Sequence, residues 1–277
     1  MVKSLVSIII PTYNEEKVID RLLVSINNQS YPRIESLVID DSSTDGTLKI
    51  ASQIATVVIK RKHAERSIQR NYGASISHGE YLLFLDADMQ LAPDVVSECI
   101  QRIQSDASIG AIAIPEQPIA SNFLEKVKAF ERSFYSEKGD PDTDAARFFP
   151  RKLFQKAGGY DETITGPEDW DLPETIVKMG YKIGRISTRI RHYERIPSLL
   201  SLIKKKYYYG LSSHRYFKKH NLSIVGPKTI YFLRPVFYKN WRQLVRNPIL
   251  TVGMLVVLAL EQLFGGLGYL VGKIKRV

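Results

Sequence analysis

Short apolar runs alternate with longer amphipathic runs through the first 115 residues of the chain. The apolar runs have the length of buried strands, and the runs between them have the spacing of helices that bury one face. Such alternation implies parallel strands joined by right-handed crossovers. The expected strands are 5–10, 35–40, 55–60, 81–85 and 109–115, and the expected helices are 17–29, 44–53, 66–77 and 93–104. The fold class is therefore α/β, with a Rossmann-like, mostly parallel sheet flanked by helices.

Polar residues collect where three of these strands end. "PTYNE" follows the first strand, Asp40 and Asp41 lie at the end of the second, and "DAD" follows the fourth. Ligands of such sheets bind at the carboxyl ends of the strands. An Asx turn with helix capping explains part of the pattern around Asp40 and Asp41. The fuller interpretation is that one of these aspartates also accepts hydrogen bonds from the N–H and hydroxyl groups of a nucleoside. Pro11 fixes the backbone after the first strand, and Glu15 is another acceptor.

Asp86 and Asp88 directly follow the apolar run "YLLFL". Two carboxylates this close repel each other unless a positive group lies between them. Mg²⁺ and similar hard cations prefer oxygen ligands, and Mg²⁺ usually takes one or two carboxylates together with substrate phosphates. The pair alone leaves two alternatives open. It either caps the next helix or stays solvated, or it serves a cation that holds a diphosphate.

Five motifs follow one another along the chain: "SIIIPTYNEE", "VIDDSSTDGT", "RSIQRNYGAS", "YLLFLDADM" and, about 80 residues later, "GPEDWDL". In this order they resemble the motifs of family 2 glycosyltransferases with the GT-A fold, and "GPEDWDL" stands at the place of that family's ED motif. The resemblance covers roughly residues 4–192. It implies transfer of a sugar from a nucleotide-diphosphate donor, UDP- or GDP-linked, to an acceptor, with inversion at the anomeric carbon and with Mg²⁺ or Mn²⁺.

The resemblance also implies roles for individual residues. The nucleotide-sugar side would comprise Pro11, Tyr13 and Glu15 at the nucleoside, Asp40 and Asp41 at the base, Arg70 near the nucleotide, Asp86 at the ribose or the metal's water, and Trp170 on a sugar face. The metal ligand would be Asp88, with Asp86 beside it. Asp169 would be the catalytic general base, with Glu168 beside it. His192 is the best-placed candidate for a further metal or phosphate contact; a packed or solvated histidine is the alternative.

The reaction itself needs carboxylates of these two kinds. A departing nucleoside diphosphate is stabilised by a cation, and an attacking hydroxyl needs a base on the acceptor side. Helix capping is the alternative for Glu168 and Asp169, because a helix is expected from about Leu172 to Met179. If the acceptor is a phosphate, which is already ionised, Asp169 would position it and not deprotonate it.

Basic residues are concentrated at the C-terminal end. From Lys182 onward there are nineteen Lys and Arg residues and only two acids, within a chain of net charge +10. A helix is expected over 192–220, where lysines and tyrosines are interleaved. The segment is interpreted as a solvated helix face, a nucleic-acid surface or a membrane surface. No nucleic-acid motif accompanies it, so nucleic acid is not an expected partner. An anionic membrane surface is favoured, with a polyprenyl-phosphate, lipid-linked or glycan acceptor.

The final apolar segment, residues 249–272, has the length of a membrane span but contains Glu261. A span, a re-entrant hairpin turning at residues 265–268, an interfacial helix and a buried or dimer-forming helix all stay open. The expected domains are 1–192 for nucleotide-sugar binding and catalysis, 193–247 as a basic helical extension and 248–277 as a membrane-associating tail. The expected location is the cytoplasmic face of the cell membrane. The single cysteine, Cys99, fits a reducing compartment.

Other enzyme classes fit less well. Haloacid dehalogenase-type hydrolases resemble one another in having Thr or Val where this chain has Gln90. A dehydrogenase would show G-x-G-x-x-G. A sugar-phosphate nucleotidyltransferase would open with a glycine-rich phosphate loop, and a catalytically inactive sugar-nucleotide-binding protein would not need both carboxylate pairs. The favoured function is glycosyl transfer in the synthesis of cell-surface polysaccharide or glycoprotein glycans.

Overall fold

The computed structural model describes residues 3–136, 145–227 and 229–275. The chain divides into two compact units. The first comprises Met1–Gln117, Asp144–Glu162 and Glu168–His192, and the second comprises Pro118–Thr143, Thr163–Pro167 and Tyr193–Val277. The second unit thus takes in two segments that precede the basic extension in the sequence.

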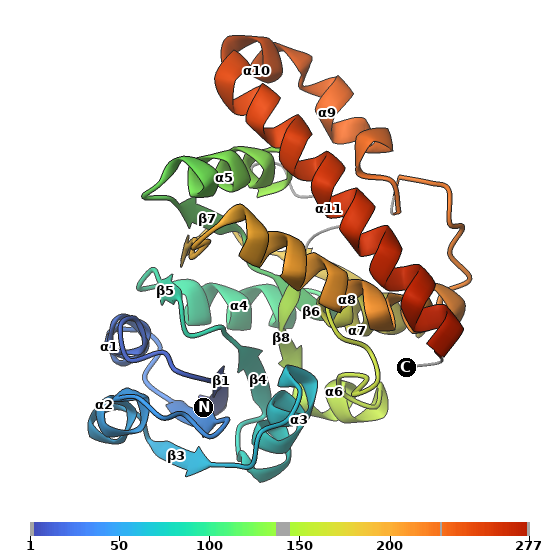
Figure 1. The fold of residues 1–277 in the computed structure, drawn as a ribbon. Coiled ribbons are helices and arrows are strands. Elements are labelled where there is room, and N and C mark those ends of the chain that lie inside the picture. The colour runs from blue at the N-terminus through green and yellow to red at the C-terminus, as the bar shows by residue number, and fades with distance from the viewer. Residues whose placement is uncertain (1–2, 137–144, 228, 276–277) are drawn as a thin grey trace. The chain divides into compact units, whose positions relative to one another are not determined.

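A seven-stranded sheet forms the centre of the first unit (Figure 1), with strand order β3-β2-β1-β4-β8-β6-β9. Its strands are β1 (Val6–Thr12), β2 (Ile34–Asp40), β3 (Val57–Lys60), β4 (Tyr81–Phe84), β6 (Ile109–Ala113), β8 (Ala146–Pro150) and β9 (Lys182–Arg185). β1 is parallel to β2 and β4, β2 is parallel to β3, and β6 is parallel to β9. Only β8 runs antiparallel to its neighbours β4 and β6. The mostly parallel sheet is confirmed.

Two hydrophobic cores cover the two faces of this sheet. Successive strand residues point to opposite faces, so Ile8 and Ile10 pack on one side and Ile9 on the other. The helices on the first side are α1 (Ile19–Asn27), α2 (Thr47–Ile54) and α4 (Val95–Gln104). Those on the second side are α3 (Arg66–Ile76), α6 (Arg151–Lys156) and α7 (Glu168–Lys178). Strands buried on both faces explain the nearly continuous apolar runs in the sequence.

The start of α7 differs from the prediction. The helix begins at Glu168 and not near Leu172, so Glu168 and Asp169 lie inside its first turn. Acidic side chains are favoured there because the unpaired N–H groups at a helix N-terminus carry partial positive charge. The acidic motif is therefore part of the helix and not of the loop before it.

A second, smaller sheet has three strands in the order β5-β10-β7. The strands are β5 (Met89–Leu91), β7 (Glu116–Ile119) and β10 (Ile190–Tyr193), and His192 pairs with Met89 across β10 and β5. The prediction of a helix from residue 192 is wrong at its start. The helix α8 (Leu199–Lys219) begins only after Pro197, where Ser198 caps it by accepting a hydrogen bond from the Ser201 N–H.

The second unit is helical. It contains α5 (Phe123–Ser136), α8, a 3₁₀ turn (Tyr231–Leu233), α9 (Pro235–Lys239), α10 (Trp241–Arg246) and α11 (Pro248–Lys275). Its core includes Phe130, Phe134, Leu202, Phe237 and Leu258. The helix α11, red in Figure 1, is unbroken through residues 265–268, which excludes the re-entrant hairpin, one of the alternatives left open by the sequence.

The polar stretch "GDPDTDAAR", residues 139–147, which the sequence indicates as a loop, lies partly outside the described residues, and its last two residues belong to β8.

Candidate active site

The two aspartates after β4 project from a turn whose apolar residues anchor it. Leu85 and Ala87 are buried, and the Leu85 N–H donates to the Ile9 carbonyl oxygen at 3.1 Å. Asp86 and Asp88 alternate with them and are partly exposed. The turn closes when the Met89 N–H donates to the Asp86 carbonyl oxygen at 3.2 Å, after which β5 begins. The local sequence thus places both carboxylates at the carboxyl end of β4.

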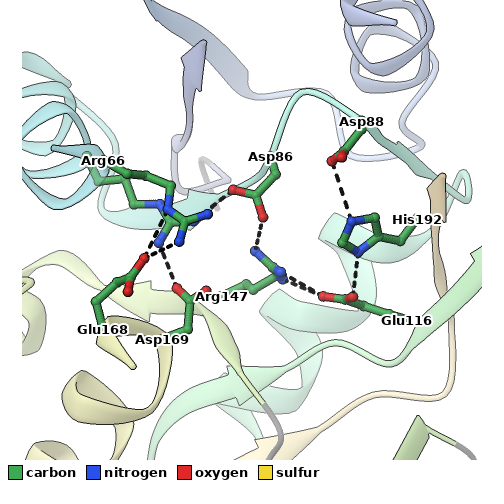
Figure 2. A network of polar contacts seen from close by, with 9 residues as sticks. Arg66, Asp86, Asp88, Glu116, Arg147, Glu168, Asp169 and His192 are labelled. Carbon is green, nitrogen blue, oxygen red and sulfur yellow. Dashed lines mark hydrogen bonds and ion pairs between the residues drawn. The ribbon is translucent and has the colours of Figure 1, made fainter. Parts of the chain in front are cut away.

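A buried guanidinium links this turn to α7. Arg70, in α3, is fully buried, and its Nη2 lies 2.8 Å from Asp86 Oδ1 while its Nη1 lies 2.7 Å from Asp169 Oδ1. The guanidinium therefore bridges the two carboxylates, which are labelled in Figure 2. The positive group that joins the D-x-D and E-D motifs within the protein is therefore an arginine. The buried atoms Arg70 Nε and Glu168 Oε2 have no hydrogen-bond partner among the described residues.

The contacts continue as a row of alternating charges. Arg147, in β8, lies 3.4 Å from Asp86 Oδ2 through Nη1 and 2.6 Å from Glu116 Oε1 through Nη2. Glu116 Oε2 lies 2.7 Å from His192 Nδ1, and His192 Nε2 lies 3.6 Å from Asp88 Oδ1. At the α7 end of these contacts, Arg66 pairs with Glu168, the neighbour of Asp169 in the first turn of that helix. We call these nine residues the charged row: Arg66, Arg70, Asp86, Asp88, Glu116, Arg147, Glu168, Asp169 and His192 (Figure 2).

The charges in this row shift the pKa values of its carboxylates. Burial would raise the pKa of Asp86, but Arg70 and Arg147 outweigh it and hold that pKa well below its ordinary value. Burial would also raise the pKa of Asp169, but nearby guanidiniums, Arg70 most strongly, outweigh it and lower that pKa. Both groups are therefore ionised at neutral pH. The row contains five carboxylates and three guanidiniums, so it carries an excess of two negative charges when His192 is neutral.

Asp88 and His192 fit a partial site for a divalent cation. The Glu116 carboxylate accepts a hydrogen bond from Nδ1 of His192, and the other ring nitrogen, Nε2, faces Asp88. A carboxylate behind a histidine in this way is a common support for metal ligation. Among the described residues no group of three His, Cys, Asp or Glu side chains is arranged to hold an ion. A cation here would therefore draw its remaining ligands from a diphosphate and water, as Mg²⁺ does.

Asp40 and Asp41 shape the loops at the end of β2. Asp40 is buried and accepts from the Ser43 N–H at 3.0 Å. Asp41 accepts from the Gln69 side chain at 2.5 Å and lies 2.6 Å from His63 Nδ1. The turn interpretation of Asp40 therefore has direct support, while contact of either residue with a nucleobase stays a prediction.

The other predicted nucleotide-sugar contacts also belong to the first unit. Pro11 is at the end of β1, opposite Ile39 of β2. Tyr13 is exposed, with its ring 5.7 Å from that of His63, and the Glu15 N–H donates to a side-chain hydroxyl of α2. Trp170 is half-buried in the first turn of α7. Their contacts with a ligand remain predictions.

Three members of the charged row were not predicted from the sequence. Arg66 is the first residue of α3, Glu116 the first of β7, and Arg147 the second of β8. Arg66 begins the motif "RSIQRNYGAS", but the motif alone gives it no role. Glu116 and Arg147 are single charged residues outside the quoted motifs, and only the strand order brings Arg147 to Asp86 and Glu116 to Arg147. The resemblance places Arg70 near the nucleotide. In the structure its guanidinium pairs with the carboxylates of Asp86 and Asp169, and contact with a nucleotide stays a prediction.

Comparison with known proteins decides the family. The sequence model of glycosyl transferase family 2 matches residues 7–156. The chain belongs to this family. It is therefore a member of a glycosyltransferase family, and its structural neighbours share its GT-A fold.

Curated relatives of this glycosyltransferase match it over part of their length. Chondroitin synthase of Escherichia coli is 27% identical over 184 residues, which are 64% of this chain and 27% of the relative. Beta-monoglucosyldiacylglycerol synthase of Nostoc sp. is 31% identical over 191 residues, 60% of this chain and 40% of the relative. The chain thus spans less than two thirds of the length of these relatives.

Two solved structures share the fold of this glycosyltransferase. The mannosyltransferase PcManGT from Pyrobaculum calidifontis, in complex with GDP-Man and Mn²⁺, has a TM-score of 0.60 at 21% identity, covering 94% of this chain and 75% of that one. S. aureus TarS 1–349, in complex with UDP-GlcNAc, has a TM-score of 0.58 at 16% identity, covering 98% and 91%.

Proposed function

We propose that this glycosyltransferase moves a sugar from a UDP- or GDP-linked donor to an acceptor hydroxyl or phosphate, with inversion at the anomeric carbon and with the help of Mg²⁺ or Mn²⁺. The observation that carries the proposal is the charged row, which connects a carboxylate on the acceptor side, Asp169, to a cation-binding pair, Asp88 and His192.

The donor side is assigned to Asp88 and His192. The excess of two negative charges favours a divalent cation there, because a diphosphate brought without a cation would be repelled. A bound cation stabilises the negative charge that develops on the departing diphosphate. Asp86 is held by two guanidiniums, so we assign it to fixing the turn and to contacts with the ribose or the metal's water.

The acceptor side is assigned to Asp169. Its carboxylate is ionised at neutral pH because Arg70 stabilises the charge, and it can therefore accept the proton of an attacking hydroxyl. If the nucleophile is a phosphate oxygen, no proton has to be removed and Asp169 orients the acceptor. Glu168, paired with Arg66, supports the first turn of α7, and Trp170 is assigned to a sugar face.

The donor proposal has support from the structural neighbours. One of them holds GDP-Man with Mn²⁺ and another holds UDP-GlcNAc. We assign the nucleoside to the end of the sheet formed by Pro11, Tyr13, Glu15, Asp40 and Asp41. Which of the two nucleobases is bound depends on the loops around Tyr13 and His63.

We further propose a polyprenyl-phosphate, lipid-linked or glycan acceptor at the cytoplasmic face of the membrane, in cell-surface polysaccharide or glycoprotein glycan synthesis. Among the described residues one helix, Pro248–Lys275, is long and apolar enough to cross a bilayer. A relative named beta-monoglucosyldiacylglycerol synthase supports an acceptor in or at a membrane. The basic C-terminal part of the chain suits anionic headgroups.

One assay tests the reaction class. The purified chain is incubated with a panel of UDP- and GDP-sugars, with Mg²⁺, Mn²⁺ or a chelator, and binding and slow hydrolysis of the donor are measured. We expect cation-dependent binding of at least one donor. Failure to bind any of them would overturn the proposal, and binding without hydrolysis or transfer would instead support an inactive sugar-nucleotide-binding protein.

A second assay tests membrane association. Full-length protein and protein truncated at residue 228 are expressed and separated into membrane and soluble fractions. We expect only the full-length chain in the membrane fraction; a fully soluble full-length chain contradicts this part of the proposal.

A further inference from the structure

The helix α11 has two faces of different character. One face is buried in the second unit and includes Met254, Leu258 and Glu261. The other is exposed and apolar, and we call it the apolar stripe: Ile249, Val252, Val256, Leu263, Leu267, Leu270 and Ile274. These residues are spaced three or four positions apart, with one interval of seven between Val256 and Leu263, which keeps them on a single helix face. The stripe runs the whole length of a helix of 28 residues.

The buried face is held by charged residues from two other helices. Glu261 is only 1% exposed, and its carboxylate lies 3.0 Å from Lys128 Nζ of α5 and 3.5 Å from Lys206 Nζ of α8. Lys128 also pairs with Glu131 in α5. The acid in the middle of the apolar helix is thus paired with lysines from within the same unit.

Glycines bring α8 and α11 into direct backbone contact. A Cβ atom on Gly268 would clash with the Tyr207 carbonyl oxygen, and one on Gly272 would clash with the Leu211 carbonyl oxygen. On α8, a Cβ on Gly210 would clash with the Gly265 carbonyl oxygen. The two helices therefore pack closely over several turns (Figure 1).

These contacts oppose a transmembrane placement of α11. If α11 crossed a bilayer with its contacts intact, α8 would enter the bilayer with it, together with Lys204, Lys205 and Lys206. Each charged side chain at the centre of a spanning helix opposes insertion into the bilayer. If α11 crossed alone, Glu261 would lose both lysines. A placement in the plane of the membrane surface keeps every contact and removes the apolar stripe from water.

The surroundings of the stripe suit anionic lipid. Exposed basic residues lie on α8, α10 and α11: Lys204, Lys205, Arg242, Arg246, Lys273 and Lys275. Each basic residue near an anionic surface adds to the electrostatic attraction. Trp241 and Tyr238 are also exposed, and aromatic rings of these types concentrate at the membrane–water boundary.

We propose that α11 lies in the plane of an anionic bilayer surface, with the apolar stripe at the boundary between headgroups and acyl chains, and does not cross the bilayer. The proposal rests on the membrane association proposed above and adds the way in which the helix is seated. It predicts that both ends of α11 stay on the same side of the membrane.

Cysteine labelling tests this placement. Asn247→Cys and Lys275→Cys mark the two exposed ends of α11, Leu263→Cys marks the stripe, and wild type with its buried Cys99 gives the background. Each protein is added to preformed phosphatidylcholine–phosphatidylglycerol vesicles and treated with a membrane-impermeant maleimide. We expect labelling at both ends and protection at Leu263→Cys. Protection of one end until detergent is added, or no protection at Leu263→Cys, overturns the proposal.

A matched pair of charge substitutions tests the stripe. Val256→Glu and Val24→Glu change valines of similar exposure, 52% and 49%, on α11 and α1. Flotation with the mixed vesicles should be lost for Val256→Glu and kept for Val24→Glu, and pure phosphatidylcholine vesicles should bind wild type less well. If Val256→Glu instead dissociates a dimer in sedimentation and leaves vesicle binding unchanged, the stripe contacts a second copy and the proposal is wrong.

The experiments distinguish failure of the membrane proposal from failure of the glycosyl-transfer proposal. Donor binding in solution, measured on the same proteins, tests glycosyl transfer without any vesicle. Loss of all vesicle binding by wild type would overturn both the in-plane placement and membrane association, while leaving the donor assay to decide the enzymatic activity.

Discussion

Arg70 is the residue on which the geometry of the site depends most. It is buried and charged, and its guanidinium joins Asp86 after β4 to Asp169 in α7. Burial would lower the pKa of Arg70, but the two carboxylates outweigh this effect and raise the pKa above its ordinary value. The arginine thus ties the turn after β4, which we assign to the donor, to the start of α7, which we assign to the acceptor.

Arg70→Met should change both stability and the pH profile. Removing one partner of a buried ion pair costs ~3–5 kcal/mol, measured by denaturant unfolding. The pKa of Asp169 is lowered in the wild type, so the ionised form persists until the pH falls below its ordinary range. Without the guanidinium this pKa rises, and the acid limb of kcat moves to higher pH. Arg102→Met, on the exposed face of α4, is the control and should change neither; an unmoved acid limb in Arg70→Met would refute the assignment of Asp169.

Glu116 is predicted to orient His192 toward a cation. Glu116→Gln weakens the contact at Nδ1 and should weaken Mn²⁺ binding ~10–100-fold, the usual effect of losing such a support. Electron paramagnetic resonance of free Mn²⁺ measures this without turnover. In a His192→Gln background the same change should have no further effect. An equal loss in that background would show that Glu116 acts through Arg147 instead.

At the residue scale, the sequence identifies the carboxylates but not the groups that pair them. Asp86, Asp88 and Asp169 are visible because they lie in short motifs at the ends of expected elements. Glu116 and Arg147 are isolated charges whose proximity arises from strand order. Arg70 shows the limit most clearly, since its motif is recognisable but its buried partners depend on how α3 packs against α7.

At the scale of elements, periodicity predicts the parallel strands and their helices well. The strands β8 and β10 were not predicted, because each is short and pairs antiparallel with a strand distant in sequence. The start of α7 was placed four residues late, since an acidic stretch resembles a loop unless the helix dipole is considered. The contact between α8 and α11 depends on backbone approach at glycines, which apolar patterning does not reveal.

The glycine contact can be tested by two alanines in the same helix. Gly272→Ala places a methyl group against the α8 backbone, whereas Gly266→Ala meets open space. The first should destabilise the protein by ~1–3 kcal/mol, typical of overpacking. The second should be neutral or stabilising by up to ~1 kcal/mol, because alanine favours helix. Thermal unfolding of both proteins measures the difference, and equal melting temperatures would show that the helices are not in close contact.

At the scale of the whole molecule, charge is unevenly distributed along the chain. The basic residues after Lys182 contrast with the acidic excess before it. This arrangement permits an acidic site that recruits a cation and a basic segment that recruits anionic headgroups in one protein.

Salt should therefore affect two activities differently. The screening length falls from ~10 Å at 0.1 M to ~3 Å at 1 M salt. Transfer to an acceptor in anionic vesicles should drop over this range, while slow donor hydrolysis in solution should change little. Radiolabelled donor assays follow both rates, and a parallel decline of the two would contradict a separate membrane-binding role for the basic segment.

The central claim is that Asp88 and Asp169 serve opposite sides of the transferred sugar. It is tested most directly by calorimetric donor binding with and without Mn²⁺, together with turnover, for wild type, Asp88→Asn and Asp169→Asn. We predict that Asp88→Asn loses Mn²⁺-dependent binding, whereas Asp169→Asn binds the donor like wild type and loses turnover. Identical behaviour of the two variants would contradict the assignment.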